Sequence, residues 1–269
     1  MLRQAINGTV AVGNASMDYA AFGRGRKHLV MIPGLGDGLT TVRGLALPFA
    51  LMYRAYAKDY RVHIFSRPDP LEDGCTTRDM ARDLHTAMAR LGIGRADVLG
   101  ISQGGMIAQH LAIDFPGSVN RLVLAVTLSR PNDVIRPVIG RWISMAQAGD
   151  YMALMTDTAE KSYSERRLRA YRPLYPILGR VGKPKDFHRF LVQARSCLCH
   201  DAHDALDRIA CPTLVIGACE DRIVGVQASS ELAERIPDSR LFLYERLGHA
   251  AYEEAGDFHA RVLRFLTQA

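Results

Sequence analysis

Short apolar runs alternate along most of the chain with longer stretches in which apolar residues recur every three or four positions. The runs are rich in aliphatic and β-branched residues and end at Gly, Pro or polar residues, which predicts strands. The later runs are apolar at nearly every position, as parallel strands covered on both faces require. The predicted strands are 28–32, 61–65, 96–101, 121–126, 213–217 and 240–244, after a hairpin of 8–13 and 17–23.

The stretches between these runs have helical spacing. Residues 76–91 place Met80, Leu84, Met88 and other apolar side chains on one face, which predicts an amphipathic helix. Similar patterns predict helices at 103–115, 227–235 and 258–266. A hairpin followed by repeated strand–helix units predicts an α/β fold, with helices on both faces of a mostly parallel sheet.

One long segment interrupts this alternation. Residues 129–207 show no strand pattern, have helical spacing, and are punctuated by prolines. The segment lies between two predicted strands, so the chain must leave the sheet and return to it. We therefore predict an inserted helical cap at 129–207 and a core made of 1–128 and 208–269.

Composition narrows the function classes. The 34 Lys and Arg residues against 28 Asp and Glu give a net charge of +6, but no basic run is interleaved with aromatics, so we expect no nucleic-acid partner. No run of 18 apolar residues is present, and 1–14 lacks an apolar core of signal-peptide length, so we expect no membrane association.

Cysteine usage points to a reducing compartment. The five cysteines are odd in number and irregularly spaced, which argues against a disulfide framework and favours a cytoplasmic location. Cys197, Cys199 and His200 form a C-x-C-H cluster without a second ligand pair. Such a cluster is weak evidence for zinc, and we expect no metal site.

The candidate nucleophile is Ser102, in the G-x-S-x-G pattern of Gly100 to Gly104. An apolar predicted strand runs directly into the pattern and a predicted helix follows it, which is the context that gives this short motif its meaning. A serine at so sharp a turn points its hydroxyl out of the sheet, and the glycines provide the room that the turn needs. The alternative is a glycine-rich turn with an incidental serine.

A second glycine-rich loop follows the strand 28–32. The loop after that strand is expected to supply one backbone N–H to an oxyanion hole, and the residue after the nucleophile supplies the other. We assign these donors to Leu35 and Gln103. The alternative, a phosphate-binding loop, lacks a G-x-G-x-x-G or Walker lysine pattern in the residues that follow.

The candidate acid and base follow later strands. Asp221 comes after the strand 213–217, at the sheet edge where Ser102 also emerges, with Glu220 as the competing carboxylate. His249 lies in the loop between the last strand and the last helix, where Gly248 permits a sharp turn. A serine hydroxyl needs a base to take its proton, and an acid can orient the histidine that does so.

Taken together, four segments resemble the α/β-hydrolase superfamily: PGLGDG from Pro33, GISQGG from Gly100, ACEDRIV from Ala218 and LGHAAYEE from Leu247. The chain looks most like capped bacterial serine esterases, enol-lactonases and carbon–carbon hydrolases. The resemblance implies an eight-stranded sheet, no cofactor, and the roles given above for Ser102, Asp221, His249, Leu35 and Gln103. The serine argues against the dehalogenase and epoxide-hydrolase branches, which use aspartate there.

The leading functional hypothesis is hydrolysis of a small-molecule carboxylic ester through an acyl-enzyme on Ser102. A lactone or carbon–carbon hydrolase with the same three residues, and a receptor-like member without turnover, are the alternatives. The sequence does not indicate an oligomeric state. Candidates for lining the pocket, unless they only pack the cap onto the sheet, are the cap residues Trp142, Met145, Tyr151, Met152 and Met155.

Overall fold

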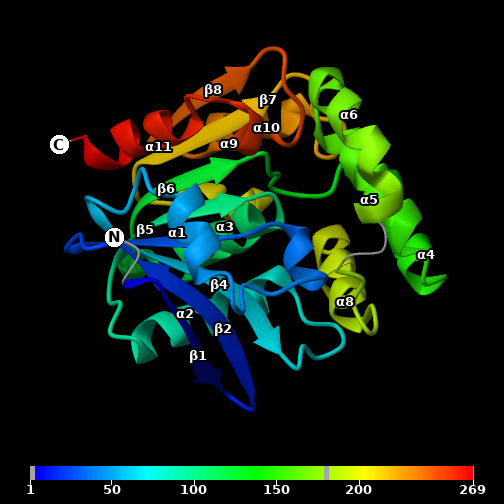
Figure 1. The fold of residues 1–269 in the computed structure, drawn as a ribbon. Helices are drawn as coiled ribbons and strands as arrows, with labels where there is room; N and C mark the ends of the chain where they lie inside the picture. The colour runs from blue at the N-terminus through cyan, green and yellow to red at the C-terminus, as the bar shows by residue number, and fades with distance from the viewer. Residues whose placement is uncertain (1–3, 179–181, 269) are drawn as a thin grey trace.

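A single sheet of eight strands runs through the part of the protein that the structure describes (Figure 1). This computed structural model describes residues 4–178 and 182–268. Across the sheet the strands follow the order β1-β2-β4-β3-β5-β6-β7-β8. The pairs β1–β2 and β2–β4 are antiparallel, and all the other neighbouring pairs are parallel. The strands are β1 (Ile6–Val12), β2 (Ala15–Phe22), β3 (Lys27–Ile32), β4 (Tyr60–Asp69), β5 (Ala96–Ile101), β6 (Val119–Ala125), β7 (Thr213–Ala218) and β8 (Ser239–Tyr244). The eight-stranded, mostly parallel sheet confirms the predicted fold class.

Helices cover both faces of the sheet. One buried cluster joins the sheet to α2, α3 and α9, and a second joins its other face to α1 and α11. Outside the segment between β6 and β7, the helices are α1 (Ala46–Met52), α2 (Thr77–Arg90), α3 (Gln103–Asp114), α9 (Val226–Arg235), α10 (Ala251–Glu254) and α11 (Phe258–Thr267), with short 3-10 turns η2 (Leu35–Gly38) and η3 (Pro116–Ser118). The pattern analysis does not predict α1, because Leu47, Leu51 and Met52 are apolar but exposed and so blur its amphipathic spacing.

The helix α2 illustrates how local sequence sets an element boundary. Thr76 caps it: the Thr76 hydroxyl accepts from the Asp79 backbone N–H at 3.1 Å, and the Asp79 carboxylate accepts from the Thr76 backbone N–H at 3.1 Å. This reciprocal capping box satisfies two donors that a helix start leaves unpaired. Met80, Leu84 and Met88 then face the core, as their spacing predicts.

The segment between β6 and β7 is helical, and no strand occurs among its described residues. It contains α4 (Ile135–Gln147), α5 (Tyr151–Ser162), α6 (Glu165–Tyr171), η4 (Arg172–Leu174), α7 (Tyr175–Leu178), α8 (His188–Leu198) and η5 (His203–Arg208). We call α4 to α8 the inserted helices; α4, α5, α6 and α8 lie together at one end of the sheet, on the right of Figure 1. The division of the chain at 129 and 207 stays a prediction.

A third buried cluster holds the inserted helices on the sheet. It joins Trp142 of α4, Leu154 of α5 and Phe190 of α8 to Leu35 and Ile223. Leu35 follows β3 and Ile223 follows β7, so the inserted helices cover the carboxyl edge of the parallel strands. That edge is where ligand sites of open α/β sheets form.

Candidate active site

Ser102 lies at a strained turn between β5 and α3. Its backbone has φ 54° and ψ −120°, a region that non-glycine residues rarely occupy. A Cβ on Gly104 would lie 1.9 Å from the Ile32 carbonyl oxygen, and one on Gly100 would lie 2.5 Å from the Gly104 carbonyl oxygen. Only glycine therefore fits at these two positions, and the turn directs Ser102 out of the sheet.

The turn is also fixed by hydrogen bonds. The Ser102 backbone N–H donates to the Ala125 carbonyl oxygen of β6 at 2.9 Å, and the Thr127 hydroxyl donates to the Ser102 carbonyl oxygen at 2.7 Å. The Gly105 N–H donates to the same Ser102 oxygen at 2.8 Å. These bonds provide the surrounding restraint that a strained backbone conformation needs in order to persist.

His249 connects Ser102 to Asp221. Its Nε2 lies 2.9 Å from Ser102 Oγ, and its Nδ1 lies 2.8 Å from Asp221 Oδ2. Asp221 and His249 are both buried, each about 7% exposed. The three residues that the sequence analysis selected from β5, β7 and the loop after β8 thus form one hydrogen-bonded chain. Glu220, the competing carboxylate, is exposed and makes no contact with His249 among the described interactions.

Asp221 is held in a defined orientation as a carboxylate. Its Oδ1 accepts from the backbone N–H groups of Ile223 at 2.8 Å and Val224 at 3.0 Å. Burial acts to raise the pKa of the Asp221 carboxyl, but attraction to His249, the hydrogen bond to it and the two backbone bonds outweigh burial and hold the pKa below its ordinary value. Asp221 therefore remains a charged acceptor for the His249 Nδ1–H.

The loop that carries His249 turns against the inserted helices. A Cβ on Gly248 would lie 2.9 Å from the Ser162 carbonyl oxygen at the end of α5, so the close approach requires glycine there. The Ala250 backbone N–H donates to the same Ser162 oxygen at 2.8 Å, and the Glu220 N–H donates to the Leu247 carbonyl oxygen at 3.0 Å. The His249 loop is thereby anchored on one side to α5 and on the other to the Asp221 loop.

The two expected oxyanion donors border Ser102. Leu35 begins η2 directly after Gly34, where an added Cβ would lie 3.3 Å from Ser102 Cβ, and Gln103 begins α3. In the described part of the chain, no protein acceptor is found for the backbone N–H of Leu35 or of Gln103. Two such N–H groups beside a nucleophile are suited to receive an oxyanion.

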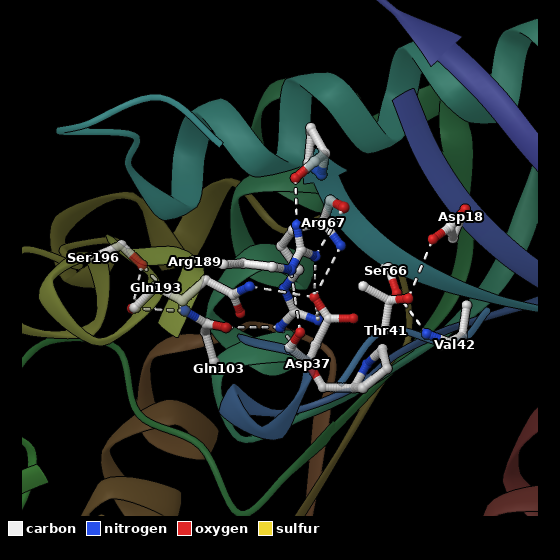
Figure 2. Close-up of polar contacts among 12 residues, drawn as sticks. Asp18, Asp37, Thr41, Val42, Ser66, Arg67, Gln103, Arg189, Gln193 and Ser196 are labelled. Atoms are coloured by element: carbon white, nitrogen blue, oxygen red, sulfur yellow. Dashed lines mark hydrogen bonds and ion pairs between the residues drawn. The ribbon is translucent and has the colours of Figure 1, made fainter. Parts of the chain in front are cut away.

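A buried polar cluster, which the sequence analysis missed, lies behind this loop. Figure 2 shows Asp37 of η2 beside Arg67 of β4 and Arg189 of α8. Asp37 Oδ2 accepts from Arg189 Nη2 at 2.6 Å, from the Arg67 backbone N–H at 3.1 Å and from Gln193 Nε2 at 3.3 Å. Arg67 Nη1 lies 3.9 Å from the same oxygen.

The cluster also reaches Gln103, the residue after Ser102. Arg67 Nη2 donates to Gln103 Oε1 at 2.8 Å and to the Pro33 carbonyl oxygen, while Gln103 Nε2 donates to the Gln193 carbonyl oxygen at 2.8 Å (Figure 2). Burial lowers the pKa of Arg67 to about 10, although the Asp37 charge opposes that shift. The position of Arg67 at the carboxyl end of β4 was the available sequence signal, since side chains at that edge gather around the site.

A cavity of about 430 Å³ opens at Ser102 and His249, and its wall is mostly apolar. Of the five cap side chains expected there, Trp142 and Met155 line it. The other three do not. Met145 packs against the buried cluster under the inserted helices, Tyr151 lies near Phe187 with ring centroids 6.4 Å apart, and Met152 is half-buried elsewhere on α5. Helical spacing alone could not separate the face of α5 toward the cavity from its neighbours.

The C-x-C-H residues are not brought together as ligands. Cys197 is buried in the cavity wall, Cys199 is exposed, and the His200 Nδ1 lies 2.9 Å from the Thr77 hydroxyl. Across residues 4–178 and 182–268, no group of three or more His, Cys, Asp or Glu residues is arranged to hold a metal ion. Within the same ranges, no helix is both long enough and apolar enough to cross a bilayer.

A family model described as the alpha/beta hydrolase fold matches residues 27–256. The chain belongs to the alpha/beta hydrolase family. A protein of Escherichia coli O1:K1 with the provisional name carbamate hydrolase RutD is 29% identical over 229 residues, which cover 82% of this chain and 84% of that protein. A protein of the same name from Cronobacter sakazakii is 27% identical and covers 84% of this chain and 85% of its own length.

Solved structures of alpha/beta hydrolases share the fold at low identity. The enol-lactonase of Burkholderia xenovorans LB400 superposes with a TM-score of 0.83 at 20% identity and covers 97% of this chain and 100% of its own. The alpha/beta hydrolase MGS-M2 from a deep-sea metagenome library of the Medee basin has a TM-score of 0.85 at 21% identity, covering 97% and 98%. The meta-cleavage product hydrolase of Pseudomonas fluorescens IP01 has a TM-score of 0.78 at 22% identity, covering 97% of each chain. Family membership makes this chain a hydrolase, and the site around Ser102 is its candidate active site.

Proposed function

We propose that this hydrolase cleaves carboxylic esters of small molecules through an acyl-enzyme on Ser102. The observation that carries the proposal is the hydrogen-bonded chain from Ser102 through His249 to Asp221, placed at the end of a mostly apolar cavity. A nucleophile, a base within hydrogen-bond reach and an acid that orients the base are the parts that serine catalysis requires.

In the first half of the proposed reaction, Ser102 Oγ attacks the ester carbonyl carbon as His249 Nε2 takes the hydroxyl proton. The carbonyl oxygen becomes an oxyanion, to which the backbone N–H groups of Leu35 and Gln103 donate. Collapse of this intermediate breaks the bond to the alcohol, which leaves with the proton from His249. Asp221 stabilises the imidazolium and keeps its proton on Nδ1.

In the second half, water replaces the alcohol. His249 accepts a proton from the water as its oxygen attacks the acyl carbon, and the same backbone donors receive the oxyanion. Collapse releases the carboxylic acid and returns the proton to Ser102 Oγ. Removing one oxyanion donor typically lowers such a rate about 100- to 1,000-fold.

The same serine could also act on other acyl compounds. Relatives of this chain are named as a carbamate hydrolase, an enol-lactonase and a meta-cleavage product hydrolase. A substrate panel should therefore contain esters, lactones, carbamates and vinylogous diketones. Turnover of esters supports the proposal. Turnover of only lactones, only carbamates or only diketones would mean that the same three residues cleave that type of bond instead.

The first experiment needs no substrate. The purified protein is treated with a fluorophosphonate, and the adduct is located by peptide mass. We expect labelling at Ser102, none in Ser102→Ala, and ester hydrolysis that disappears in the same variant. A folded wild-type protein that is not labelled and hydrolyses nothing would favour a receptor-like role, and activity in Ser102→Ala would refute the mechanism.

A further inference from the structure

The cavity wall contains acidic side chains but no Lys or Arg among its described lining residues. Besides His249, the charged side chains among them are Asp37 and Glu253. Asp37 is compensated, since Arg189 pairs with it at 2.6 Å. Glu253 takes part in no ion pair within the described ranges, so its carboxylate is an unpaired charge of the cavity wall. Glu253 is an exposed residue, so water partly screens this charge.

Three tyrosines of the cavity wall lie near this carboxylate. The Tyr163 hydroxyl donates to Glu253 Oε2 at 2.6 Å, and Tyr53 and Tyr252 line the cavity as well. Burial and then the Glu253 charge raise the pKa of Tyr53 to about 12, and the same two causes raise the pKa of Tyr163 and Tyr252. The phenols therefore stay neutral, and this end of the cavity presents one anion among aromatic rings.

A cation close to these tyrosines, Arg167, lies outside the cavity lining. Arg167 of α6 lies over the ring of Tyr171, 5.3 Å from its centroid, and Tyr171 meets Tyr163 edge-on with centroids 5.0 Å apart. Arg167 is not among the lining residues. A substrate group at this end of the cavity would thus meet Glu253 and the tyrosines rather than a guanidinium.

Glu253 is also held in place. It belongs to α10, and its neighbour Glu254 accepts from the Ser164 backbone N–H at 2.8 Å and from the Ser164 hydroxyl at 2.5 Å. These bonds fasten α10 to the junction of α5 and α6, which lie beside it in Figure 1. The backbone that carries Glu253 is therefore anchored between the inserted helices and the His249 loop, and the Tyr163 hydroxyl holds its carboxylate.

We propose that Glu253 is a specificity-determining residue that selects substrates by charge. Esters whose far end is neutral or positively charged are preferred, and esters that end in a carboxylate are disfavoured. An anion beside Glu253 is repelled by its carboxylate, whereas an ammonium group is attracted by the carboxylate and can also contact the neighbouring tyrosine rings. Because Glu253 is exposed, both effects have the size expected near a protein surface rather than in a buried site. The inference rests on the proposed ester hydrolysis, because it assumes that the cavity holds the acyl group.

The test uses p-nitrophenyl esters in matched sets. Within each set the acyl chain has one length and ends in a methyl, a carboxylate or a trimethylammonium group, and the sets run from short to medium chains. For the wild type we expect kcat/KM to be higher for the methyl and ammonium esters than for the carboxylate ester at the chain length that reaches Glu253. We expect Glu253→Gln to lower the ratio of kcat/KM for the ammonium ester to kcat/KM for the carboxylate ester by about tenfold.

A matched control isolates the effect of the position. Glu245→Gln removes the same charge from an exposed residue outside the cavity lining, so it should leave the ratio at its wild-type value. A wild type that prefers the carboxylate ester, or a ratio that Glu253→Gln and Glu245→Gln leave equally unchanged, would overturn the inference.

Failure of the proposed function gives a different result. If the wild type hydrolyses no ester of any charge, ester hydrolysis fails, and the charge preference is then measured by calorimetry with the corresponding amides. Weaker binding of the carboxylate amide, relieved in Glu253→Gln, would still support selection by charge. Equal binding of all three amides would refute it independently of turnover.

Discussion

Asp37→Asn is the substitution that most directly tests the buried cluster behind the oxyanion loop. The Asp37 carboxylate is 1% exposed and the Arg67 side chain 2% exposed, so neither charge has water to replace a lost partner. Asparagine keeps the size of the side chain and can still accept hydrogen bonds. It removes the negative charge that offsets two guanidinium groups, Arg67 and Arg189.

The expected magnitude follows from that burial. Removing one partner of a buried ion pair typically costs about 3–5 kcal/mol, because the remaining charge stays buried without compensation. The penalty is larger for Arg67 than for Arg189, because burial already lowers the pKa of Arg67 to about 10. Arg189, with 15% of its side chain exposed, can recover part of its hydration. We therefore expect Asp37→Asn to lower the free energy of unfolding by about 3 kcal/mol.

The assay is urea unfolding of the wild type and two variants. Asp114→Asn provides the matched control: Asp114 pairs with Arg78 at 2.7 Å, but the Arg78 side chain is 56% exposed. Pairs of that kind contribute about 0–1 kcal/mol. If Asp37→Asn loses no more stability than Asp114→Asn, the Asp37 charge does not stabilise the cluster.

The same variant has an expected effect on catalysis. Asp37 lies in the turn that begins at Leu35, and Arg67 contacts both the Pro33 carbonyl and the Gln103 side chain. Loosening this turn should misplace the expected oxyanion donors, which act on the transition state. We therefore expect kcat to fall while KM changes little, and a rise in KM alone would argue against a role in positioning the donors.

Three further outcomes are expected. Gly104→Ala should abolish fluorophosphonate labelling, because the new Cβ would lie 1.9 Å from the Ile32 carbonyl oxygen, whereas Gly117→Ala, with nothing within 4 Å, should be labelled like the wild type. Gly140→Ala in α4 should raise the free energy of unfolding by about 1 kcal/mol, because the space around Gly140 is open and alanine favours a helix. The urea midpoint should rise accordingly, and a lower midpoint would contradict this. Burial lowers the pKa of His63 to about 4 and of His200 to about 3 from 6.5, so only the unfolded chain takes up these protons as the pH falls below 6.5. Stability should therefore decline toward pH 4 by about 1.4 kcal/mol per pH unit for each histidine, and equal urea midpoints at about pH 7 and pH 5 would count against this.

The parts of the fold that could be predicted are those that local sequence dictates. Strands such as Ala96–Ile101 and Thr213–Ala218 are buried along their whole length, so their apolar runs stand out. Parallel strands share one carboxyl edge, and the order of the motifs along the chain therefore sufficed to select Ser102, Asp221 and His249 as neighbours.

The cluster around Asp37 could not be predicted in the same way. Asp37 and Arg67 are 30 residues apart, and Arg189 is 152 residues from Asp37. No local period relates a short turn, a strand end and a helix of the insertion. Glu253 could not be predicted either, because its proposed role depends on contacts between α10 and the distant inserted helices.

The inserted helices contact the site at two separate places, which gives them a role beyond covering it. The helix α8 reaches the oxyanion loop through Arg189, and an added Cβ on Gly38 of that loop would lie 2.8 Å from the Phe190 Cα. The end of α5 reaches the His249 loop through the Ser162 carbonyl oxygen. The inserted helices also supply Trp142 of α4 and Met155 of α5 to the cavity wall, so a change in their packing alters the cavity, the turn at Leu35 and the His249 loop together. Variants of the inserted helices should therefore shift specificity and kcat jointly rather than separately.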